Sequence, residues 1–336
     1  MAPRASVLLP VFNGAATVER AVSSILVQDF YDLEIIAVDD GSTDGTGAIL
    51  GRLAETDSRL RVISLQRNQG IVAALNLAAS AARGDVLVRM DADDFAHPER
   101  VRLQLAALDA DAPLDAVTCG VRHVSSTGAG MARYVEWLNG LKTPESIHRE
   151  RFVESPVAHP AVAMRAAAFH EVGGYRDTPW AEDYDLWLRL LHRGPCIGSV
   201  PEVLLDWSDE PGRLSRASGR YSLERFADCR AHHLARVPSI ARFGVEISGG
   251  GPTAKRLARA LHAEGVRIHT FFDVHPRRVG AELDGVPVRG VGSMRPASPE
   301  APVQLAAAGT PAARVRIREL LTSLGYIEGH SFFCVA

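Results

Sequence analysis

Residues 86–94 read Val-Leu-Val-Arg-Met-Asp-Ala-Asp-Asp, a short, largely apolar run that ends in three carboxylates. A similar run, Glu34-Ile-Ile-Ala-Val-Asp-Asp-Gly-Ser42, ends in two aspartates and a glycine. A third run, Ser6-Val-Leu-Leu-Pro-Val11, is followed by Phe-Asn-Gly. Short apolar runs bounded by turn-forming residues are typical of strands that are buried on both faces of a parallel sheet.

The segments between these runs have the apolar spacing of helices, as at Val18, Val22 and Ile25. A further strand is predicted at Leu60–Leu65, and a helix follows it at Gly70–Ala82. Alternation of strands and helices with short connections predicts an α/β fold with a doubly wound, mostly parallel sheet. Ligands of such sheets bind at the carboxyl ends of the strands, where the aspartates lie.

The strand–helix pattern restarts after Pro238. Strands are predicted at Val245–Ser248, Arg267–Phe272, Val303–Ala307 and Ser331–Val335, with helices between them. A chain of 336 residues has room for two domains at roughly 100–200 residues each. We therefore predict a large domain at 1–238 and a small Rossmann-like α/β domain at 239–336.

A glycine-rich turn, Gly249-Gly-Gly-Pro-Thr-Ala254, begins the first helix of the small domain and fits the G-x-G-x-x-A pattern of dinucleotide-binding turns. Asp273 follows the next predicted strand, where a ribose-binding acid would lie. One such half cannot hold a whole dinucleotide. Ligand binding and a packing or oligomerisation role both remain open for this domain.

Composition excludes several classes of protein. The net charge of −3 gives no electrostatic basis for nucleic-acid binding. The four cysteines form no C-x-x-C motif, which favours buried thiols over a disulfide framework or a zinc site. No apolar stretch approaches the roughly 18 residues of a membrane-spanning helix, so we expect a cytoplasmic protein.

Three groups of acids are candidates for chemistry, and each also has a structural explanation. Asp91, Asp93 and Asp94 are hard oxygen ligands that suit Mg²⁺ or Mn²⁺, or they form an acidic loop in which Asp94 caps the next helix. Asp39-Asp-Gly-Ser42 offers acceptors for a nucleobase or a ribose, or it closes a strand with an Asx-turn. Glu182 and Asp183 begin an amphipathic helix, where a carboxylate serves as a general base or as an N-cap.

Six motifs that occur in order give the chain a resemblance to family 2 glycosyltransferases, which have the GT-A fold. The resemblance covers about residues 4–220. The motifs are Ser6–Asn13, Glu34–Asp44, Arg67-Asn-Gln-Gly70 with Ala74 and Asn76, Arg83-Gly-Asp85, Met90-Asp-Ala-Asp-Asp94 and Glu182-Asp-Tyr-Asp-Leu-Trp-Leu-Arg189.

The resemblance implies a role for each matching position. The nucleobase and ribose of a nucleotide-sugar would be bound by Pro10, Val11, Asn13, Asp39, Asp40, Asn68 and Asp91. A divalent metal, Mn²⁺ or Mg²⁺, would be held by Asp93 and Asp91, with Asp94 as a further ligand. Asp183 matches the catalytic base and Glu182 would help to place the acceptor. His159 and Trp180 would line the acceptor pocket, although a structural role for His159 beside Pro160 fits equally well.

The chain departs from the family pattern in two places. Many relatives carry His-Pro-Gly before Ser-Arg, but here the segment reads Asp209-Glu-Pro-Gly-Arg-Leu-Ser-Arg216. Glu210 replaces the histidine, and Arg213 or Arg216 would clamp phosphate. The Q-x-x-R-W motif of processive synthases is absent from the sequence, so we expect transfer of one sugar per encounter.

The resemblance predicts an inverting glycosyltransferase that moves a sugar, usually from a UDP-sugar, to a hydroxyl of a glycan or lipid-linked acceptor in cell-wall or polysaccharide biosynthesis. Peripheral membrane contact and homo-oligomerisation remain open. Two other functions compete: a GT-A-like nucleotide-binding protein without transferase activity, and an NAD-dependent oxidoreductase that uses the C-terminal glycine-rich turn. The intact acids argue against the first alternative. The motifs of the large domain need no hydride chemistry, which argues against the second.

Overall fold

A computed structural model describes residues 2–110, 114–124, 129–208 and 218–336. The chain forms two compact units. The first unit comprises residues 1–148, 156–178 and 182–217, and the second comprises residues 149–155, 179–181 and 218–336. The second unit therefore begins before the predicted boundary at Pro238. Whether 1–238 and 239–336 fold independently stays a prediction.

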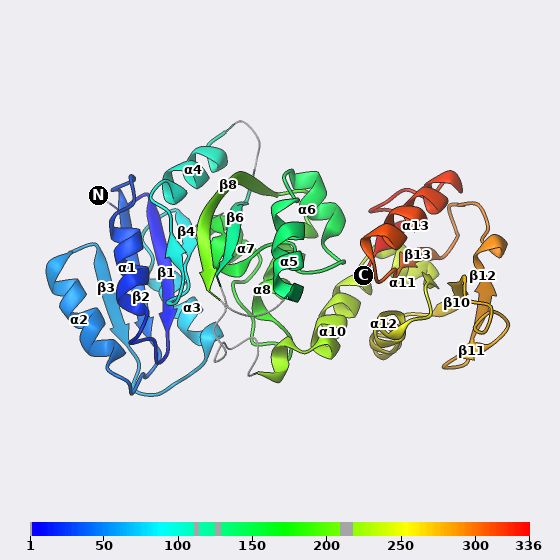
Figure 1. The fold of residues 1–336 in the computed structure, drawn as a ribbon, viewed down its shortest axis with the longest axis horizontal. Coiled ribbons are helices and arrows are strands. Elements are labelled where there is room, and N and C mark those ends of the chain that lie inside the picture. The colour runs from blue at the N-terminus through cyan, green and yellow to red at the C-terminus, as the bar shows by residue number, and fades with distance from the viewer. Residues whose placement is uncertain (1, 111–113, 125–128, 209–217) are drawn as a thin grey trace. The chain divides into compact units, whose positions relative to one another are not determined.

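The first unit contains an eight-stranded sheet with the order β3-β2-β1-β4-β7-β6-β8-β5 (Figure 1). The first four strands of this order are parallel to one another, whereas β7 is antiparallel to both of its neighbours. The strands are β1 (Ala5–Val11), β2 (Leu33–Asp39), β3 (Leu60–Ser64), β4 (Val86–Arg89), β5 (Phe95–Ala96), β6 (Ala116–Val124), β7 (Ala163–Arg165) and β8 (Ile197–Ser208). The α/β class and the mostly parallel sheet are confirmed.

Helices cover both faces of this sheet (Figure 1). They are α1 (Val18–Leu26), α2 (Thr46–Thr56), α3 (Ile71–Ala81), α4 (Arg100–Leu108), α5 (Ala129–Asn139), α6 (Pro144–Glu150), α7 (Ala166–Glu171) and α8 (Glu182–Leu191), with a 3₁₀ turn η1 (His159–Ala161). Leu9 of β1 lies in one core cluster with Val22 of α1, while its neighbour Leu8 lies in a second cluster with Leu75 of α3 and Trp187 of α8. Alternate residues of a strand point to opposite faces, so a continuous apolar run supplies both cores.

Strand register brings the polar ends of the strands together. Val11 pairs with Asp39 between β1 and β2, and Leu8 pairs with Arg89 between β1 and β4. All three strands are parallel, so the segments that follow them leave the sheet at the same edge. The predicted donor and metal residues therefore share one edge, as the strand pattern indicated.

The second unit contains a six-stranded sheet with the order β11-β12-β10-β9-β13-β14, parallel except between β11 and β12. Its strands are β9 (Val245–Ser248), β10 (Ile268–Asp273), β11 (Glu282–Leu283), β12 (Val286–Gly290), β13 (Val303–Ala306) and β14 (Phe332–Cys334). Its helices are α10 (Leu223–Leu234), α11 (Pro238–Phe243), α12 (Pro252–Ala263) and α13 (Pro311–Ser323), with 3₁₀ turns η2 (Gly219–Tyr221) and η3 (Val291–Ser293). Thr310 caps α13 by accepting a hydrogen bond from the Ala313 N–H at 3.2 Å.

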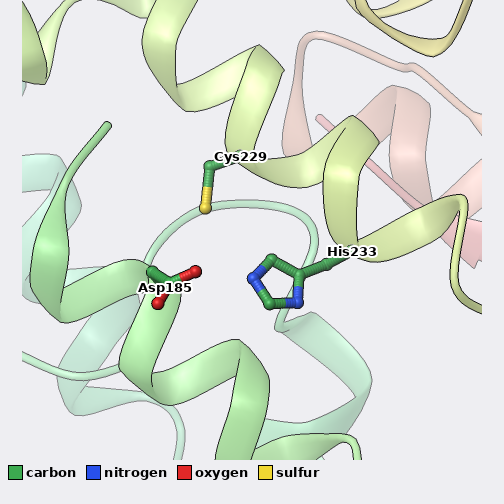
Figure 2. A group of neighbouring side chains, drawn as sticks. All are labelled: Asp185, Cys229 and His233. Carbon is green, nitrogen blue, oxygen red and sulfur yellow. The ribbon is translucent and has the colours of Figure 1, made fainter. Parts of the chain in front are cut away.

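A short segment from the middle of the chain forms part of the second unit. Phe152 packs edge-on against Phe333, with 5.6 Å between the ring centroids. The Arg318 guanidinium donates to Glu150 Oε1 at 2.5 Å. Helix α10 contributes Cys229 and His233, which lie one turn apart and are both buried (Figure 2). The C-terminal region is thus tied to residues far away in the sequence.

Candidate active site

The loops that follow β1 and β2 are joined by hydrogen bonds. The Asn13 N–H donates to Ser42 Oγ, and Asn13 Oδ1 accepts from the Thr43 N–H, both at 2.9 Å. Asn13 has a φ of 51°, a left-handed conformation that asparagine tolerates better than most residues. This conformation lets one asparagine bond to the facing loop through both its backbone and its side chain, so the loop after β1 is held in place.

Asp40 holds the loop that follows β3. Its two carboxylate oxygens accept the backbone N–H groups of Gln69 at 2.7 Å and Gly70 at 2.8 Å. Beside it, Gly41 has a φ of 71°, and a Cβ atom there would lie 2.5 Å from the Arg67 carbonyl carbon. Only glycine allows the two loops to approach so closely. This contact places Asn68 beside the end of β2.

Asp39 also forms a local turn, because its Oδ1 accepts the Ser42 N–H at 3.0 Å. Asp39 therefore closes the end of the strand through its side chain, as the structural explanation expected, but the bond reaches three residues along the chain and not the two of an Asx-turn. Asp39 and Asp40 are 6% and 3% exposed. Their predicted contact with a nucleotide is a further role beside these hydrogen bonds, and it stays a prediction.

The carboxylates of Asp91, Asp93 and Asp94 converge after β4. One oxygen from each lies within 4.8 Å of the others. Asp94 is fully buried and accepts the Ser208 N–H at 2.8 Å, which ties it to the end of β8. The alternative that Asp94 caps the next helix is wrong, because α4 begins at Arg100 and its N-cap is Glu99. Three converging carboxylates are a donor set that fits a hard divalent cation.

Arg89 was not identified from the sequence. It is the last residue of β4, its side chain is 3% exposed, and it forms an ion pair with Asp91. A charged residue inside the otherwise apolar run Val86–Met90 was the available signal, because central parallel strands are normally apolar. The role of this arginine depends on which acids surround its side chain, and only the structure shows those acids.

The general-base candidate lies at the start of α8. Glu182 is the first residue of the helix and is 1% exposed, and Asp183 beside it is partly buried. Burial and the neighbouring Glu182 carboxylate raise the pKa of Asp183 to about 7, against the opposing effects of the Tyr184 N–H and the Arg89 charge. A carboxyl group with this pKa exchanges a proton near neutral pH, as a general base must.

His159 is buried beside these acids. Its Nε2 lies 2.8 Å from the Tyr175 hydroxyl oxygen, and its Nδ1 lies 3.9 Å from Glu182 Oε1. Tyr175 is itself fixed by Asn76 of α3, whose side chain bonds to its backbone N–H and carbonyl oxygen. His159 is 8% exposed. The structural role weighed for it is therefore well supported, and its predicted contact with an acceptor stays a prediction.

The other acids, arginines and aromatic residue named from the sequence have other contacts or lie outside the described residues. Trp180 belongs to the second unit, where its ring lies 5.1 Å from that of His232. Glu210, Arg213 and Arg216 lie outside the described residues. Asp185, on the first turn of α8 (Figure 2), accepts a hydrogen bond from Arg189 Nε at 2.7 Å. This third acid of the helix has a charge partner of its own.

Sequence comparison decides the family. The family model "Glycosyl transferase family 2" matches residues 6–173. The chain belongs to glycosyltransferase family 2. This glycosyltransferase is 31% identical over 229 residues to the putative glycosyltransferase EpsE of Bacillus subtilis, a match that covers 66% of this chain and 79% of the relative. It is 28% identical over 235 residues to the O-antigen biosynthesis glycosyltransferase WbnJ of Escherichia coli, covering 68% and 87% of the two chains.

Solved structures of glycosyltransferases share the fold. TarS of S. aureus, solved in complex with UDP-GlcNAc, matches with a TM-score of 0.58 and 20% identity over 77% of this chain and 71% of that chain. The mannosyltransferase PcManGT of Pyrobaculum calidifontis, in complex with GDP-Man and Mn²⁺, matches with a TM-score of 0.55 and 24% identity, covering 79% and 70%. The enzyme thus has the GT-A fold that the motifs predicted. Within the part of the chain that the structure describes, no helix is long and apolar enough to span a membrane.

Proposed function

We propose that this enzyme transfers a sugar from a nucleotide-sugar, with UDP as the favoured nucleotide, to a hydroxyl group of a glycan or lipid-linked acceptor, with inversion at the anomeric carbon. The observation that carries the proposal is the pair of acidic sites, one after β4 and one at the start of α8, of which the second has a pKa near neutrality. A relative named for O-antigen biosynthesis and a neighbour solved with UDP-GlcNAc support the choice of pathway class and donor.

The donor side of the reaction is assigned to the loops after β1, β2, β3 and β4. The nucleoside is bound by Pro10, Val11, Asn13, Asp39, Asp40, Asn68 and Asp91. Asp91, Asp93 and Asp94 would hold Mn²⁺ or Mg²⁺, and a neighbour solved with Mn²⁺ supports this. A bound divalent cation neutralises the charge that develops on a diphosphate leaving group.

Asp183 is the proposed general base on the acceptor side. A sugar hydroxyl has a pKa far above neutrality, so a base within about 3 Å must take its proton as the new bond forms. Asp183 Oδ accepts this proton while the hydroxyl oxygen attacks the anomeric carbon, and the bond from that carbon to the diphosphate breaks. Glu182 is buried beside Asp183 and places the acceptor, with His159 next to it.

A donor panel tests this function. UDP-, GDP- and dTDP-sugars are incubated with glycan acceptors and Mn²⁺ or Mg²⁺, and release of the nucleoside diphosphate is measured together with the anomeric configuration of the product. We expect transfer from a UDP-sugar with inversion. Nucleotide binding without turnover of any donor would instead indicate a binding protein. Thermal stabilisation by NAD alone would indicate the oxidoreductase alternative.

A further inference from the structure

Arg89 carries a positive charge inside the central sheet of the first unit. Its side chain is 3% exposed, and Val86, Leu87 and Val88 before it in β4 are apolar and buried. A buried guanidinium has lost its hydration, and it is tolerated only where nearby acids compensate for that loss. The packing of β4 needs no charge at this position, so the reason for the arginine lies in its polar neighbours.

These neighbours belong to both sides of the proposed reaction. Nη1 of Arg89 pairs with Asp91 on the donor side. Nε of Arg89 is buried and has no hydrogen-bond partner within the described ranges. On the acceptor side, the charge of Arg89 opposes the effects of burial and of Glu182, which raise the pKa of Asp183. It also opposes the burial that raises the pKa of Tyr175, the residue bonded to His159.

The backbone fixes where this charge lies. The Arg89 N–H donates to the Val162 carbonyl oxygen at 2.9 Å, and the Arg89 carbonyl oxygen accepts from Arg100 Nη2 at 2.8 Å. Arg100 is itself fully buried and also donates to the Pro160 carbonyl oxygen, in the turn that contains His159. Arg89 is therefore held at the end of the strand that precedes the metal-site acids, next to the segment that contains His159 and faces Glu182.

We propose that Arg89 is a positioning residue, which orients Asp91 for the donor and supplies the shared counter-charge for the acids at the start of α8. This inference rests on the proposed function, because it takes Asp91 and Asp183 as donor and base residues. Groups that act on Asp183 are Glu182 and the Tyr184 N–H of α8 and Arg89 of β4, with Tyr175 in the segment before α8. His159, whose Nδ1 lies 3.9 Å from Glu182 Oε1, faces the same acids. The positive charge of Arg89 favours the ionised form of Asp183, so its removal takes away an attraction that holds the pKa of Asp183 down.

The pH dependence of turnover tests the proposal. In Arg89→Gln we expect the acidic limb of the kcat profile to move upward by at least about half a pH unit, because a counter-charge for the base is lost. Activity should fall by at least about threefold at pH 6.5, which is the factor that half a pH unit gives, and partly recover at pH 9, and the KM for the donor should rise. Arg89→Lys, which keeps the charge, should restore the wild-type limb.

A matched control is available on the neighbouring strand. Arg165 of β7 pairs with Val86 at the other end of β4, and its guanidinium donates to the carbonyl oxygens of Leu108 and Leu114. Arg165→Gln should lower the melting temperature and leave the pH profile unchanged. A merely structural role for Arg89 would make Arg89→Gln behave in the same way, with activity reduced equally at every pH, and that result would overturn the proposal.

A second measurement needs no turnover. Melting temperatures of the metal-free wild type, Arg89→Gln, Asp183→Asn and the double variant form a cycle at pH 8. We expect Arg89→Gln to lower the melting temperature less in the Asp183→Asn background, by about 3 °C or more, because the carboxylate that the Arg89 charge stabilises is already gone. If the changes in melting temperature of the two single variants simply add in the double variant, Arg89 is not a counter-charge for Asp183.

If Asp183→Asn keeps wild-type turnover, the proposed base is wrong, and the melting-temperature cycle alone decides the role of Arg89. If Arg89→Gln does not fold, Arg89→Lys decides: a wild-type limb and donor KM support the proposal, and a pH-independent loss refutes it.

Discussion

Replacing Asp183 by asparagine removes the proposed base with little change in shape. General-base removal commonly costs about 10²–10⁴ in rate. We expect transfer to fall at least about a hundredfold while the affinity for the donor nucleotide stays near normal, because the donor residues lie after β1–β4 and not on α8. Nucleotide release kinetics and calorimetric titration with UDP measure the two quantities separately.

The same substitution has a pH-dependent effect on stability. The pKa of Asp183 is raised from its ordinary value of 3.8 to about 7, so the folded state binds this proton more tightly than the unfolded state. The stability that protonation contributes is therefore lost as the pH rises through this window. Asparagine never ionises and avoids that loss, so Asp183→Asn should be more stable than the wild type above neutral pH.

The size of this effect on stability follows from the shift in the pKa of Asp183. One pKa unit corresponds to about 1.4 kcal/mol, so the two units between pH 5 and pH 7 correspond to at most about 3 kcal/mol. Asp183 is partly exposed, and solvent screening reduces this to about 1–2 kcal/mol. The melting temperature of Asp183→Asn, relative to the wild type, should therefore be higher at pH 8 than at pH 5 by roughly 5 °C.

Two neighbouring acids serve as controls. Asp185→Asn breaks the pair with Arg189 and should lower stability without removing the base. Glu182→Gln removes a like charge that raises the pKa of Asp183, so the acidic limb of the rate profile should move to lower pH. Wild-type turnover in Asp183→Asn, combined with loss of activity in Glu182→Gln, would reverse the assignment of the base. A stability difference that is flat between pH 5 and pH 8 would refute the electrostatic reasoning.

Three further predictions concern the metal site, the loop contact and the second unit. Asp93→Asn should keep the fold and lose most of its Mn²⁺-dependent affinity for UDP; equal UDP binding with and without EDTA in both proteins would exclude the metal role. Gly41→Ala should destabilise the protein by at least about 2 kcal/mol in thermal melts, because its Cβ would meet the Arg67 backbone. Gly45→Ala, with a φ of 93° but nothing within 4 Å of its Cβ, should cost less, and equal losses would contradict the close-contact argument. The fragment 1–238 should still bind UDP, because it keeps every donor residue, but it should melt at a lower temperature, because Phe152 and Glu150 lose Phe333 and Arg318. A folded fragment that does not bind UDP would show that the donor site depends on the second unit.

Local pattern was enough to predict the parallel strands and the acids at their ends. The apolar runs at β1, β2 and β4 are continuous because both faces of the sheet are covered, and continuity is visible in sequence. Parallel strands that are hydrogen-bonded neighbours end at the same edge, so the acids after them had to be close together. Six ordered motifs then indicated the family without any knowledge of distances.

Tertiary structure alone decided which polar side chains meet across long stretches of sequence. Asp94 accepts a hydrogen bond from Ser208, and Asp40 accepts two from the loop after β3. Each of these contacts joins residues that no periodicity relates. Arg89 and Tyr175 were missed for the same reason, because the effect of a buried charge depends on burial and on neighbours from other elements. The membership of residues 149–155 in the second unit likewise depends on packing that only the folded chain provides.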